Sequence, residues 1–137
     1  MTDPGDILQT RETRTVHVSL RRDGIILQRM LPVQRQTLQD ARDNLAAFNT
    51  LAAGTPHPML LDARHSVTID ASVSNFYTSP ENTGSISAMA ILISSRIGRS
   101  VGNVFIAVRP QAYPTRMFTS EDDALVWLRK FAPPPTT

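Results

Sequence analysis

The sequence predicts one α/β domain: a mostly parallel open sheet of about five strands, an antiparallel hairpin at its N-terminal edge and about four helices. Three observations lead to this prediction. Strand-like apolar runs alternate with segments of helical periodicity along most of the 137 residues. The length suits a single hydrophobic core. Hydrophobic residues make up 41% of the chain and charged residues 19%, as is typical of a globular domain.

The N-terminal hairpin is predicted from alternation and a turn signal. Residues 13–20 place Val16 and Val18 on one face, as a half-buried strand does. Residues 22–24 read Arg-Asp-Gly, which favours a tight turn, and residues 24–31 then read as a second strand. We therefore expect two antiparallel strands at the start of the domain.

The two ends of the chain show no such patterns. Residues 1–12 mix Pro, Gly, Asp and Gln without periodicity, and the chain closes on a Pro-rich segment that cannot continue a helix. We expect the domain to span residues 13–131, with flexible termini at 1–12 and 132–137.

The first helix has the strongest signals. Thr37 can cap it, and Asp40, three residues on, can complete a capping-box arrangement. Gly54 offers a left-handed stop. Apolar residues recur between them at helical spacing: Leu38, Ala41, Leu45, Phe48 and Ala52.

The rest of the chain continues the alternation of strands and helices. The apolar run at residues 59–63 reads as a buried strand. Ser120 can cap the last helix, whose first turn carries three acidic residues that suit the helix dipole. The other elements expected are a helix, a strand, a helix, a strand and the last helix, over residues 70–77, 85–94, 96–108, 115–119 and 121–131.

Composition excludes several function classes. With no cysteine, the chain has neither disulfides nor thiolate chemistry. It has no run of 18 apolar residues, and its N-terminus is acidic rather than basic and then apolar, so we expect a cytoplasmic protein without a membrane segment. A formal net charge of +2 gives little reason to expect nucleic acid as a partner.

Four segments carry a family resemblance: TLQDARDNLAAF (37–48), MLLDAR (59–64), ILISSRIGRSVGNVFI (91–106) and PTRMFTSEDDALVWL (114–128). Together with the order of elements, they resemble bacterial proteins of the STAS/SEC14-like superfamily, including small relatives of the sporulation anti-sigma-factor antagonist. The resemblance implies a SpoIIAA-like fold and a role in partner switching. It brings no catalytic motif to this chain.

The same resemblance singles out Ser72 as a phosphorylation candidate. Residues 60–73 are similar to the STAS segment in which a D-S-S-G motif opens a helix, and Asp70, Ala71 and Ser72 fall on its first three positions. Ala71 replaces a serine of that motif and Val73 replaces its glycine. The alternative is an ordinary serine at a helix start.

A basic stretch suggests a second site. From residue 82 to residue 120 the chain has four arginines and no acid, and Arg96, Arg99 and Arg116 could bind an anion through their planar guanidinium groups. The alternative is that these arginines are solvated or paired with acids elsewhere. Ile97, Val101 and Phe105, on the helix expected here, are candidates for an interaction surface.

These observations favour binding over catalysis. The three histidines lie apart, and consecutive acids point in different directions on a helix, so we expect no metal, cofactor or catalytic site. The leading hypothesis is a regulatory or protein-interaction module, with a second copy of the chain among its candidate partners. The alternative is a domain that binds a nucleotide, a lipid or another small anion in a basic crevice.

Overall fold

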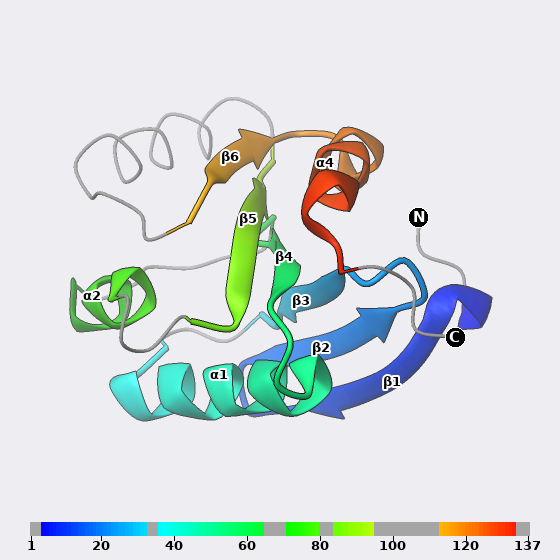
Figure 1. The fold of residues 1–137 in the computed structure, drawn as a ribbon. Helices are drawn as coiled ribbons and strands as arrows, with labels where there is room; N and C mark the ends of the chain where they lie inside the picture. Colours follow the sequence, from blue (N-terminus) through cyan, green and yellow to red (C-terminus); the bar gives the residue numbers. More distant parts are fainter. Residues whose placement is uncertain (1–3, 33–35, 65–70, 80–83, 95–112, 134–137) are drawn as a thin grey trace.

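The fold is built on one mixed sheet with helices on both faces (Figure 1). The computed structural model describes residues 4–32, 36–64, 71–79, 84–94 and 113–133. Its strands are β1 (Ile7–Glu12), β2 (Val16–Arg21), β3 (Ile26–Met30), β4 (His57–Asp62), β5 (Ile86–Leu92) and β6 (Thr115–Phe118). Its helices are α1 (Leu38–Ala52), α2 (Ala71–Thr78) and α4 (Glu121–Leu128), with short 3-10 helices at Pro4–Asp6 and Arg129–Phe131.

The six strands follow one another in sequence order across the sheet. β1, β2 and β3 pair antiparallel, whereas β3 to β6 all pair parallel. The carboxyl ends of β3, β4, β5 and β6 therefore lie along one edge, which is where open α/β sheets place their ligands.

The predicted hairpin is confirmed as β2 and β3, joined by a turn in which Gly24 has a φ of +87°. The strand count differs, because residues 7–12, expected to be flexible, form β1. This edge strand gave no signal in the sequence because five of its six residues are exposed and Leu8 lies at a register shift, so apolar and polar residues do not alternate. The predicted count of about four helices is not matched, and the helix expected at 96–108 lies outside the described residues.

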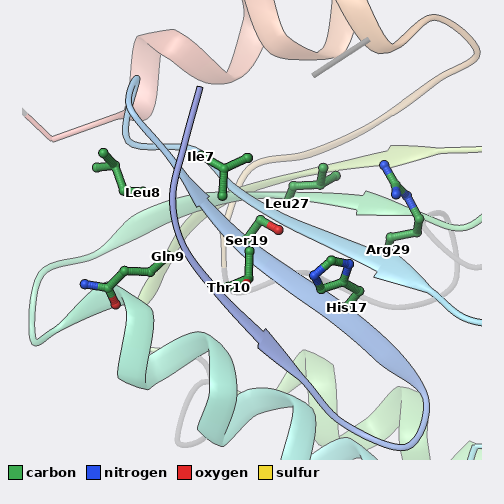
Figure 2. Close-up of a pocket in the computed structure, with 8 residues that line it drawn as sticks. All are labelled: Ile7, Leu8, Gln9, Thr10, His17, Ser19, Leu27 and Arg29. Carbon is green, nitrogen blue, oxygen red and sulfur yellow. The ribbon is translucent and has the colours of Figure 1, made fainter. Parts of the chain in front are cut away.

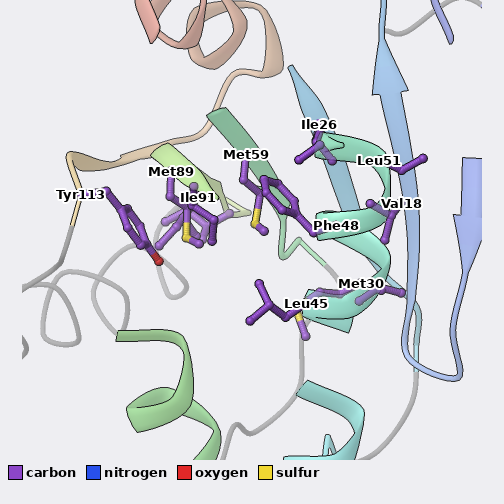
Figure 3. Close-up of a cluster of buried hydrophobic side chains, with 14 residues drawn as sticks. Val18, Ile26, Met30, Leu45, Phe48, Leu51, Met59, Met89, Ile91 and Tyr113 are labelled. Carbon is purple, nitrogen blue, oxygen red and sulfur yellow. The ribbon is translucent and has the colours of Figure 1, made fainter. Parts of the chain in front are cut away.

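The central strands are buried on both faces. Met59 and Met89 point to the α1 side, where Phe48 lies fully buried at the centre of the larger cluster (Figure 3). Their neighbours in the chain, Leu60 and Ala90, point to the other side, into a cluster shared with α4. Each fully buried aliphatic or aromatic side chain contributes about 1.5–3 kcal/mol, so these two layers account for most of the favourable burial.

Polar contacts fix α1 to the corner between β1 and β2. The predicted capping box is present: the Asp40 amide donates to the Thr37 hydroxyl at 3.1 Å, and the Thr37 amide donates to the Asp40 carboxylate at 2.8 Å. Arg14 donates to the same carboxylate, with a distance of 2.9 Å from its Nε. One turn along, the Asn44 amide donates to the Thr15 hydroxyl at 2.9 Å. The start of the helix and the strand corner are thus held together.

Replacing Asp40 should give a pH-dependent loss of stability. The hydrogen bond from Arg14 lowers the pKa of Asp40 far below the ordinary 3.8, although burial acts in the opposite direction. The stabilisation is therefore present above pH 3.8 and is lost as the pH falls toward the lowered pKa. We predict that Asp40→Asn melts below the wild type at neutral pH and that the difference narrows in acid. A difference in melting temperature that is constant from pH 7 to about pH 3 would contradict this.

Gln28 is a polar residue in an apolar layer. It is 2% exposed and lies between Ile26 and Met30 on the α1 side, and within the described chain its Oε1 has no hydrogen-bond partner. An unsatisfied buried acceptor costs about 1–3 kcal/mol. We predict that Gln28→Met, which keeps the side-chain length, raises the free energy of unfolding by about 1 kcal/mol in urea titrations. Gln28→Ala, which leaves a cavity, should lower it, and equal losses in both variants would refute the prediction.

Candidate functional site

One half of the sheet has a face that α4 does not cover. α4 packs against β4, β5 and β6, and beside it the same face of β1, β2 and β3 forms a groove of about 490 Å³ (Figure 2). We call this the open groove, and it is lined by Ile7, Leu8, Gln9, Thr10, His17, Ser19, Leu27 and Arg29.

The strand pattern explains which side chains line it. Val16 and Val18 of β2 enter the α1 core, so His17 and Ser19 must point to the opposite face. The pairing register then sets their neighbours: His17 lies opposite Arg29 of β3, and Ser19 lies opposite both Leu27 of β3 and Thr10 of β1. Figure 2 shows these side chains on adjacent strands along one face of the sheet.

An ion-pair cluster lies next to the groove, at the carboxyl end of β4. The Asp62 side chain is 2% exposed and accepts two hydrogen bonds from the Arg64 side chain, at 2.9 Å from Nε and 2.7 Å from Nη2, and one from the Arg64 backbone amide at 3.2 Å. Arg29, directly opposite Asp62 in the register, approaches the same carboxylate with its Nε at 3.6 Å. Burial alone would raise the pKa of Asp62, but hydrogen bonds from Arg64 and the charges of both arginines outweigh it and lower that pKa.

In this cluster Arg29 keeps N–H donors that no described residue uses. Arg64 already satisfies Asp62 through two short bonds, while Arg29 contributes a looser ion pair and keeps 47% of its side-chain surface exposed. A guanidinium group has five N–H donors. Within the described ranges, no residue accepts a hydrogen bond from Arg29.

Of the residues predicted from the sequence, the structure describes Ser72 and Arg116. Ser72 is exposed in the first turn of α2, and its phosphorylation stays a prediction. Arg116 is exposed on β6 and lies over the rings of Phe118 and Trp127, 5.2 and 5.7 Å from their centroids. The remaining candidates lie outside the described residues: Arg96, Ile97, Arg99, Val101 and Phe105.

Arg116 does not belong to the open groove. β6 and β3 are separated by β4 and β5, which places Arg116 about 14 Å of sheet away from the β3 strand that carries Arg29. The cation–π contacts instead place Arg116 against the rings of Phe118 and Trp127.

His17 and Arg29 are not among the site residues that the sequence predicts. Alternation in β2 did place His17 on the sheet surface, away from Val16 and Val18. Nothing in the sequence paired His17 with Arg29, because that contact depends on the register between β2 and β3.

The described residues contain neither a metal-binding cluster nor a membrane-spanning helix. They contain no group of three or more His, Cys, Asp or Glu residues arranged to hold a metal ion. Among the described helices, none has the length and hydrophobicity that crossing a membrane requires.

Comparison with known proteins places the chain in a fold class. An uncharacterized protein of the DUF3478 family from Shewanella loihica, with a SpoIIAA-like fold, superposes with a TM-score of 0.57 over 88% of this chain and 90% of that one, at 15% identity. This likeness shows a STAS-like, SpoIIAA-like fold, as the sequence resemblance implied. Residues 18–132 match a family described as a domain of unknown function (DUF7793), and the chain belongs to that family.

A second solved structure is more similar in sequence. It is a protein with unknown function from Arthrobacter sp. FB24, 32% identical, with 81% of this chain and 96% of that one covered. The TM-score of this pair is 0.32, so the fold assignment rests on the Shewanella structure. A search of curated proteins finds no match.

The position of Arg116 can be tested through Trp127, the single tryptophan of the chain. We predict that Arg116→Gln changes the fluorescence of Trp127 but lowers the free energy of unfolding by no more than about 1 kcal/mol, the value of an exposed cation–π contact. Arg42→Gln, on the exposed side of α1, is the control and should leave the fluorescence unchanged. An unchanged spectrum in Arg116→Gln would place its side chain away from the ring.

Proposed function

We propose that this domain is a non-enzymatic protein-interaction module of the STAS-like type that binds a second copy of itself through β1. The observation that carries the proposal is the exposure of this strand. β1 is the edge of the described sheet, it pairs with β2 on one side, and five of its six residues are exposed. Such an edge presents backbone groups that can pair with another strand.

The residues of β1 are compatible with pairing to themselves. In such a dimer a two-fold axis relates the two antiparallel edge strands. Each residue then lies opposite a residue whose side chain is on the same face of the sheet. Centred on Thr10, the pairing sets Gln9 opposite Arg11 and Leu8 opposite Glu12, with no like charges directly opposed. Leu8, which is 50% exposed, would lose part of that exposure.

The neighbouring registers are less favourable. A pairing centred on Arg11 sets that arginine opposite its own copy, and one centred on Gln9 places the irregularity between Ile7 and Gln9 in the middle of the ladder. Like charges directly opposed across two strands are destabilising. Charge therefore disfavours the Arg11 register, the irregular backbone disfavours the Gln9 register, and the Thr10 register remains.

The open groove gives further support to binding over catalysis. Ser19, the hydroxyl residue on its floor, is 6% exposed and has Leu27 and Thr10 as its cross-strand neighbours. His17 lies on the same face of β2, but within the described residues its ring makes no hydrogen bond to the Ser19 hydroxyl, which an attacking serine needs from its general base. A regulatory role fits the exposed position of Ser72, whose modification would add charge to the first turn of α2.

Two opposite substitutions at one exposed position test the self-association. Gln9→Lys would face Arg11 of the second copy at two symmetric places, whereas Gln9→Glu would pair with it. We predict that Gln9→Lys weakens the dimer and Gln9→Glu strengthens it, each by about threefold to tenfold in dissociation constant. Sedimentation over a range of concentrations would measure this against the monomer mass of 15.1 kDa.

The double variant Gln9→Lys, Arg11→Glu is the decisive control, because it restores opposite charges in the same register. It should recover the dimer lost in Gln9→Lys. A mass of 15.1 kDa for the wild type at every concentration would overturn the proposal. So would equal effects of the two Gln9 variants.

A further inference from the structure

We propose that the open groove binds a small organic monoanion, a carboxylate attached to a compact apolar body, with Arg29 as the residue that receives the carboxylate. The inference does not depend on self-association through β1. It rests on the size of the groove, the Arg29 donors that no described residue uses, the apolar residues beside Arg29 and the balance of charge around it.

The volume sets the size of the ligand. About 490 Å³ lies within the range of small-molecule sites, which is about 300–1,000 Å³. A bare inorganic anion would leave most of that space to water, so the groove suits an anion with an organic body.

Arg29 supplies the site for the charge. Its planar guanidinium can form two parallel hydrogen bonds to a carboxylate. Since Arg64 holds Asp62 at 2.9 and 2.7 Å, an incoming carboxylate can take up the Arg29 donors without leaving Asp62 unpaired. His17, directly opposite Arg29, adds a ring nitrogen on the same face.

The apolar body has a place beside Arg29, along the same face of β3 and toward β1. Leu27 is 4% exposed and belongs to the cluster packed under α4, so it forms a fixed wall. Ile7 reaches the groove from β1, and Thr10 and Ser19, which lie in the same cross-strand row as Leu27, add hydroxyls to the lining (Figure 2).

The surrounding charges limit the ligand to one negative charge. The charge of Asp62 is balanced by Arg64, which leaves Arg29 as the positive charge that lines the groove. Glu12 is exposed and lies opposite His17, so it would repel a second negative charge. A carboxylate fits this balance better than a phosphate dianion.

Benzoate is the probe, with benzyl alcohol as its neutral counterpart of similar shape and inorganic phosphate as the anion without an apolar body. Each is titrated into the full chain, followed by amide chemical shifts, at a protein concentration where light scattering gives 15.1 kDa. We predict that benzoate shifts the amides of β1, β2 and β3 around the groove with a dissociation constant of about 1 mM. Benzyl alcohol and phosphate should bind at least about tenfold more weakly.

Variants assign the effect to Arg29. Arg29→Gln should weaken benzoate about tenfold or more, while its melting temperature confirms that it folds, since Asp62 keeps its bonds to Arg64. Arg42→Gln removes the same charge from the exposed side of α1 and should leave binding unchanged. Glu12→Gln removes the neighbouring negative charge and should strengthen it.

Four results would overturn the proposal. They are equal binding of benzoate and benzyl alcohol, phosphate binding as tightly as benzoate, equal effects of Arg29→Gln and Arg42→Gln, and amide shifts that lie away from the groove. None of these four results bears on the β1 dimer, because self-association is measured as a mass in the absence of ligand.

Discussion

The burial of β4 and β5 on both faces is the constraint from which the rest of the structure follows. A strand of this kind needs a helical layer on each side, and here Phe48 of α1 and Leu128 of α4 supply the buried centres of the two layers. The helices differ in length, at 15 residues for α1 and 8 for α4. α1 packs on β1, β2 and β3 on its side, whereas α4 packs on β4, β5 and β6 on the other. The unequal cover leaves the open groove and the β1 edge exposed.

The ion pairs at the carboxyl edge follow from the same geometry. Asp62 ends the central strand β4, so its carboxylate is nearly removed from water and must be compensated. Arg64 does this with two hydrogen bonds, and Arg29 with a looser contact. Removing Arg64 would leave the buried Asp62 charge with only the looser Arg29 contact, so Arg64 has a structural role. Arg29 keeps donors that no described residue uses, at the boundary between the half of the sheet that α4 covers and the half that it does not.

Local signals in the sequence predicted much of the fold. The Thr37 and Ser120 caps and the β2–β3 turn depend on residues close in the chain, and the structure has all three. β1 was missed because an exposed edge strand need not alternate. The open groove was missed for a different reason: Arg29 meets His17 and Asp62 only through the register of three strands, and a shift of one residue would turn its side chain to the other face.

We infer that the N-terminal half of the sheet, which α4 does not cover, is the binding surface of this domain. The most direct test is a set of backbone amide spectra of the full chain recorded from dilute to concentrated solution. We predict concentration-dependent shifts that gather at Ile7–Glu12 and fade toward β4 and β5. Shifts centred on α1 or on α4, with β1 unchanged, would contradict the account.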